Sequence, residues 1–87
     1  MHFEEIDRHD FRIYAGACEV PGGGFTAGVA VRRVRGSGVG ELPVIYREDE
    51  LAGGHRRAAP AEALRYAIGK GVTAVEQHRA RPFLGLS

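Results

Sequence analysis

The longest regular pattern of hydrophobic and polar positions runs from Pro60 to Arg79. At about 100° per residue, the aliphatic side chains after Glu62 fall on one arc, whereas the opposite arc is mainly polar. Such a pattern is typical of a helix with one face on a core and the other in water. Pro60 suits the first helical position and Pro82 prevents continuation. The pattern therefore predicts a helix over residues 60–79.

Two glycines lie within this predicted helix, and the pattern places them on opposite arcs. Gly71 falls on the apolar arc, where a missing side chain lets a helix approach a sheet closely. Gly69 falls on the polar arc, where no packing reason for a glycine is evident. Each costs roughly 1 kcal/mol relative to alanine in a helix interior.

Two earlier stretches alternate with a period of two, as β-strands with one buried face do. They flank the sequence Pro-Gly-Gly-Gly at 21–24, in which proline and glycine supply the backbone angles of a turn. The pattern predicts a β-hairpin over 11–34 and a third, antiparallel strand over 42–47. One hairpin face is small, because it carries Gly16, Gly28 and Ala30, and would accept another backbone at close range.

The remaining segments are expected to be irregular. Residues 1–10 read as a flexible acidic N-terminus, either frayed or forming a short helical turn that pins Phe3 and Ile6. The glycine-rich stretch 36–40 fits no phosphate-binding motif and reads as a linker. Residues 80–87 form an apolar tail that either docks on the core or reaches a partner chain.

These elements predict one α+β domain, a three-stranded antiparallel sheet with one long C-terminal helix packed on one face. The order and the segment Pro60-Ala61-Glu62-Ala63-Leu64 resemble small bacterial domains of unknown function, in which a glycine-rich hairpin and a third strand precede a P-x-E-A-L helix. The chain is also weakly similar to HicB-type antitoxins, which have a similar E-A-L helix start. A third resemblance is to the C-terminal part of double-stranded-RNA-binding domains, where a basic segment stands before the last helix as Gly54-His55-Arg56-Arg57 does here.

The composition bears on the binding partners and the cellular compartment of the protein. A net charge of +1 gives no general attraction to nucleic acid or membrane. The only cysteine, Cys18, cannot form an internal disulfide, which indicates a reducing, cytoplasmic compartment. No apolar stretch is long enough to span a bilayer, and the acidic N-terminus does not resemble a signal peptide.

Candidate catalytic and metal-binding residues form no signature. The four histidines lack the close spacing of zinc ligands, and Cys18 has no flanking nucleophile motif. Consecutive carboxylates at 48–50 point alternately on an extended chain, so they would not converge on one ion. We therefore predict no catalytic residue, no bound metal and no cofactor.

Basic residues provide the one candidate binding site, for nucleic acid or another anion. They end the second strand and precede the helix: Arg32, Arg33, Arg35, His55, Arg56 and Arg57. If the strand end and the helix start lie at the same end of the sheet, these cations would meet there, beside the helix N–H groups. The alternative interpretation is a solvated polar rim balanced by the acidic run at 48–50.

Three functions follow from these features. The leading hypothesis is a non-enzymatic protein-interaction module that forms a homodimer through the bare sheet face or the apolar tail. The alternatives are an RNA- or DNA-binding domain that uses the basic rim, and an antitoxin-like partner of a small toxin. A small enzyme using Cys18 or a histidine is a further hypothesis that no motif supports.

Overall fold

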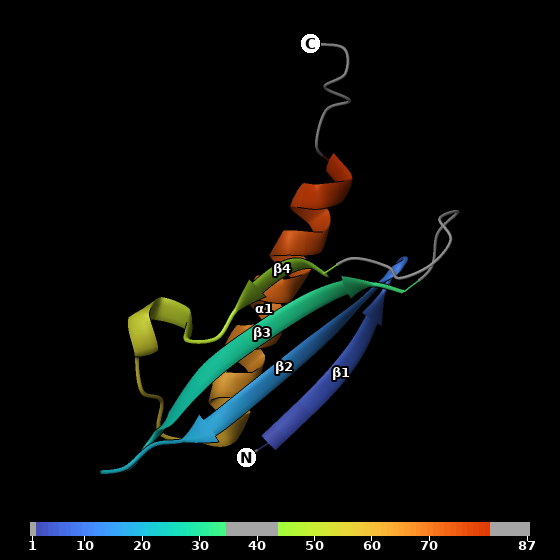
Figure 1. Cartoon of the computed structure of the whole chain (residues 1–87). Helices are drawn as coiled ribbons and strands as arrows, with labels where there is room; N and C mark the ends of the chain where they lie inside the picture. Colours follow the sequence, from blue (N-terminus) through green and yellow to red (C-terminus); the bar gives the residue numbers. More distant parts are fainter. Residues whose placement is uncertain (1, 35–43, 81–87) are drawn as a thin grey trace.

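The protein folds as one antiparallel sheet with a long helix across one of its faces (Figure 1). The computed structural model describes residues 2–34 and 44–80. The four strands lie in the order in which they occur along the chain. The elements are β1 (His2–Arg8), β2 (Phe11–Glu19), β3 (Phe25–Arg33), β4 (Val44–Glu48), the short 3-10 helix η1 (Leu51–Gly54) and α1 (Pro60–Ala80). The predicted α+β class with a C-terminal helix is thereby confirmed.

The prediction of three strands and a flexible acidic N-terminus was wrong, because residues 2–8 form the additional strand β1. This strand pairs antiparallel with β2 along its whole length, from His2 opposite Ala17 to Arg8 opposite Phe11. Its only partly buried side chain is that of Ile6, so the apolar alternation of a half-buried strand is missing. Pairing of the backbone places β1 at the edge of the sheet, where charged side chains are common.

The predicted hairpin is formed by β2 and β3, which pair from Phe11 opposite Arg33 to Glu19 opposite Phe25. The predicted turn at 21–24 connects them. All three of its glycines have positive φ, between 88° and 103°, which side chains rarely permit. The buried core face of the hairpin consists of alternate residues, namely Phe11, Ile13, Ala15, Ala17, Ala27, Val29 and Val31.

Strand β4 pairs antiparallel with β3, as predicted for the third strand, and runs from Val44 to Glu48. The predicted start at residue 42, Arg35, the linker at 36–40 and the tail after Ala80 lie outside the described residues. A register shift between Val31 and Arg32 interrupts the pairing. Beyond β4 the chain passes close over Gly28, where an added Cβ would lie 2.8 Å from the carbonyl oxygen of Asp49.

Helix α1 packs on the core face of β2 and β3, as its apolar arc predicted. Its buried residues recur every four positions, at Ala63, Ala67, Gly71 and Val75. Gly71 lies against the sheet, since a Cβ there would stand 2.5 Å from Cγ2 of Ile13. Leu51 of η1 is also buried in this core. Within the described ranges, no helix combines the length and hydropathy needed to cross a membrane.

Candidate functional site

The sheet face opposite α1 is the candidate functional site, and we call it the open face. Side chains alternate between the two faces along each strand, so residues directly opposite one another share a face. The register and the two hollows assign to the open face Phe3, Glu5, Asp7, Arg12, Tyr14, Gly16, Cys18, Thr26, Gly28, Ala30, Arg32, Val44, Arg47 and Asp49. Its centre carries the small residues that the sequence predicted there.

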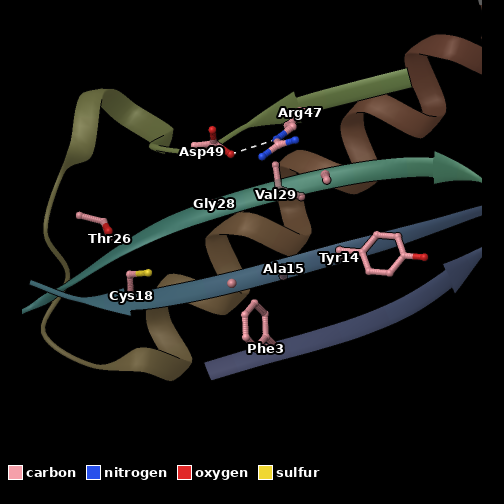
Figure 2. Close-up of a pocket in the computed structure, with 11 residues that line it drawn as sticks. Phe3, Tyr14, Ala15, Cys18, Thr26, Gly28, Val29, Arg47 and Asp49 are labelled. Carbon is pink, nitrogen blue, oxygen red and sulfur yellow. Dashed lines mark hydrogen bonds and ion pairs between the residues drawn. The ribbon is translucent and has the colours of Figure 1, made fainter. Parts of the chain in front are cut away.

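A shallow hollow of about 340 Å³ occupies the middle of the open face (Figure 2). Gly16, Gly28 and Ala30 line its base because they lack large side chains. Phe3 of β1 borders it, and an added Cβ on Gly16 would lie 3.5 Å from this ring. The ring is 72% exposed, although it is a large hydrophobic side chain. The hollow is thus an apolar surface that the described part of the chain leaves accessible to solvent.

The open face carries two charged pairs, of which Arg47 and Asp49 line the hollow. Nε of Arg12 donates a hydrogen bond to Oδ1 of Asp7 at 2.8 Å, and this bond is the main reason that the pKa of Arg12 is raised. Nε of Arg47 lies 3.1 Å from Oδ1 of Asp49 in a second ion pair (Figure 2). Both pairs are exposed, so each contributes at most about 1 kcal/mol to stability.

A second hollow of about 440 Å³ lies beside the first, towards the end of β3. It is lined by Tyr14, Ala30, Arg32, Val44 and Arg47. Arg32 stands directly opposite Arg12 in the register. Among the described residues, none forms an ion pair with Arg32. This end of the open face therefore combines one aromatic ring with several guanidinium groups.

The structure does not bring the predicted basic residues together. Arg57 lies at the start of β3, where its backbone exchanges two 2.8 Å hydrogen bonds with Phe25. Arg32 and Arg33 lie at the opposite end of the same strand. Seven residues separate Phe25 from Arg32, which at about 3.3 Å per residue is about 23 Å. The strand end and the helix start are thus at opposite ends of the sheet, and the predicted condition for one cluster fails.

The basic segment before the helix makes structural contacts instead. The guanidinium carbon of Arg57 lies 4.0 Å from the centre of the Tyr66 ring, in a cation–π contact. Arg56 packs over the hairpin turn, since an added Cβ on Gly24 would lie 3.1 Å from its Cβ. His55 is exposed. Arg56 and Arg57 thus hold the connection between η1 and α1 against the hairpin.

The sequence prediction missed Tyr14 and Arg47, which line the second hollow, and Arg12, which stands opposite Arg32 in the register. Arg12 and Tyr14 alternate with the buried residues of β2, so the hairpin pattern already placed them on the bare face with Arg32. Their grouping with Arg47 depends on the register between β3 and β4, where Ala30 stands opposite Arg47. Because the pairing is irregular between Val31 and Arg32, this register cannot be predicted by counting residues along the sequence.

The histidines point to different parts of the molecule. His2 and His78 make edge-on ring contacts with Phe25 and Phe11, and Nε2 of His9 lies 3.7 Å from a carboxylate oxygen of Glu76. Over residues 2–34 and 44–80, no three histidine, cysteine or acidic side chains are grouped as metal ligands.

Two carboxylates of the acidic run at 48–50 have different partners. Oε1 of Glu48 accepts a 2.6 Å hydrogen bond from the hydroxyl of Tyr46. Asp49 instead pairs with Arg47 on the open face. The hydrogen bond between Tyr46 and Glu48 is also the main cause of the raised pKa of Tyr46.

Comparisons with protein-family models, curated proteins and solved structures found no match for this chain.

Proposed function

We propose that this protein is a non-enzymatic interaction module that binds another protein chain through the open face. The observation that carries this proposal is the apolar hollow, with a base of glycine and alanine and a largely exposed phenylalanine at its border. Exposed apolar patches bordered by polar residues are characteristic of protein interaction sites. Helix α1 covers the other face, so the open face is the one that remains for a partner.

The charges around the hollow favour a protein partner over a polyanion. The cations Arg12, Arg32 and Arg47 are balanced on the same face by the acids Glu5, Asp7 and Asp49. Binding to a phosphate backbone draws its affinity from an excess of positive charge, which releases counterions. A balanced rim around an apolar centre is the arrangement common in protein interfaces.

Site-specific photo-crosslinking in living cells tests this proposal. Phe3 is replaced with a photoreactive phenylalanine analogue, which keeps an aromatic ring at the border of the hollow. The matched control carries the same analogue at Lys70, on the exposed side of α1. We expect a discrete protein adduct from position 3 that is absent from position 70, with both chains identified by mass spectrometry. No adduct from position 3, or the same adducts from both positions, would overturn the proposal.

The identity of the adduct separates the kinds of protein partner. A small toxin encoded beside this chain would indicate the antitoxin-like role that the HicB resemblance implies. A second copy of the same chain would indicate self-association.

The second candidate function is binding of single-stranded nucleic acid, which the second hollow favours. An aromatic ring beside guanidinium groups, here Tyr14 with Arg32 and Arg47, is the combination on which bases stack. A gel shift that weakens with salt would support this function. If the open face is responsible, replacing Arg32 and Arg47 with alanine abolishes the shift, whereas replacing Arg56 and Arg57 does not. No retardation at low salt removes this candidate.

A further inference from the structure

We infer that the protein chain bound by the open face is a second copy of this protein, packed sheet against sheet about a two-fold axis parallel to the strands. This inference rests on the proposed function and names its partner. It follows from the distribution of charge across the open face, from the small residues at its centre and from the area available.

The register arranges the open face in rows that cross the strands. One row runs from Asp7 of β1 through Arg12 to Arg32 of β3. The next runs from Glu5 through Tyr14 and Ala30 to Arg47 of β4, as the pairings Glu5–Tyr14, Tyr14–Ala30 and Ala30–Arg47 specify. In both rows the acid lies on β1, at one edge, and the last cation lies on β3 or β4, although Arg47 also pairs with Asp49 of its own chain.

This polarity makes the face complementary to itself. A two-fold axis parallel to the strands lays β1 of one copy over β4 of the other and keeps each row opposite its own copy. Glu5 then faces Arg47 of the second copy, and Asp7 faces the side that carries Arg32. Because the axis is two-fold, each contact occurs twice, as in every isologous interface. An axis across the strands would instead lay β1 over β1 and place no cation of the second copy opposite these acids.

The centre of the face suits the close approach of two sheets. Packed sheets usually lie about 10 Å apart, a spacing set by the side chains between them. Gly16, Gly28 and Ala30 leave space there, and Phe3 projects beside it. About the same axis, the ring of Phe3, which leans over Gly16, comes to lie on the side of the second copy that carries Gly28, where the backbone of Asp49 passes close over the glycine. Each copy thus supplies one aromatic ring to the apolar centre of the contact.

The area of the open face is close to what a specific contact needs. The strands contain 7, 9, 9 and 5 residues, so at about 3.3 Å per residue and about 4.8 Å between strands the face covers about 475 Å² in each copy, or about 950 Å² for the pair. A specific interface generally needs about 1,000 Å² in total, so the face lies at the lower limit of this requirement. A dimer of this kind is therefore expected to dissociate on dilution.

Charge exchange combined with sedimentation tests the inference. The wild-type protein is expected to shift from monomer to dimer as its concentration rises into the high micromolar range. The variants Glu5→Arg and Arg47→Glu each place like charges opposite one another twice, so each is expected to weaken association by about tenfold or more. The double variant Glu5→Arg, Arg47→Glu restores opposite charges and is expected to recover the dimer. Lys70→Glu, on the exposed side of α1, serves as the control and leaves association unchanged.

Cys18 supplies a second readout that needs no substitution of Cys18 itself. It is half-buried and lines the hollow, so a second sheet would cover it. Its rate of reaction with a thiol reagent should fall as the concentration of wild-type protein rises, and should not fall for Glu5→Arg. Circular dichroism confirms that each variant is folded before its association is interpreted.

The possible outcomes are distinct. A monomer at all concentrations, or a dimer that both single variants leave intact, overturns the inference. If the protein is monomeric while the analogue at position 3 crosslinks a different protein, the proposed function stands and the second copy is excluded. Failure of both experiments removes the proposed function as well.

Discussion

Helix α1 contains two glycines that should respond in opposite ways to the same substitution. An added Cβ at Gly71 would lie 2.5 Å from Cγ2 of Ile13 and 3.2 Å from Cγ2 of Val29. Ile13 has no exposed surface, so its side chain has no free space into which to move. An added Cβ at Gly69 would meet no atom within 4 Å. Substitution with alanine therefore separates helix propensity from packing.

The two effects have known magnitudes. Alanine is more favourable than glycine in a helix interior by about 1 kcal/mol at either position. At Gly71 the added methyl group overpacks the core, which typically costs about 1–3 kcal/mol. The shorter contact belongs to a fully buried side chain, so we expect a cost near the upper end of that range. The expected net effect is a loss of about 1–2 kcal/mol for Gly71→Ala and a gain of about 1 kcal/mol for Gly69→Ala.

Thermal unfolding followed by circular dichroism measures both effects. For a domain of this size, about 1 kcal/mol shifts the Tm by about 4–8 °C, so the two variants should differ by at least about 8 °C. All proteins are compared at one low concentration, because self-association would raise the apparent stability. A Tm for Gly71→Ala equal to or above that of the wild type would refute the reasoning, since the helix would then have room to move away from the sheet.

Two further predictions concern the strands. Gly28→Ala is expected to cost about 1–3 kcal/mol of stability, because the added Cβ meets the rigid backbone of Asp49 at 2.8 Å. Gly16→Ala should be nearly neutral, because its added Cβ lies 3.5 Å from the side-chain ring of Phe3. Urea unfolding at low protein concentration measures both, and equal losses of stability would contradict this reasoning. The hydrogen bond to Glu48 raises the pKa of Tyr46, so its stabilising effect is present below about pH 10, the ordinary value of tyrosine, and is lost as the pH rises through the higher folded value. Absorbance titration should show one late-ionising tyrosine that ionises earlier in Glu48→Ala, and an unchanged curve would show that this bond is not the cause.

The sequence predicted those elements whose side chains are sorted by burial. Helix α1 and the hairpin each place apolar residues at one period and polar residues between them, because one face lies on the core and the other in water. The turn at 21–24 was predictable for a separate reason. Positive φ is sterically costly for residues with a Cβ, so a run of glycines marks the position directly.

Strand β1 was not predictable in this way. Six of its seven residues are exposed, so no burial pattern records which side faces the sheet. The strand is defined by backbone pairing with β2, and backbone hydrogen bonds are the same for every residue type except proline. The sequence alone therefore gave an acidic segment without a regular structure, whereas the tertiary structure added an edge strand that carries Phe3.

The candidate site, too, was predictable from the sequence only in part. The bare centre of the open face followed from alternation, because Gly16, Gly28 and Ala30 lie between buried neighbours. Which charges surround it depended on the strand order and on the register of β4, both of which are long-range properties. The antiparallel path of β3 carries Arg32 away from Arg57 by the length of the strand. Local pattern thus determined which residues turn away from the core, and only the pairing of distant segments decided which of them meet.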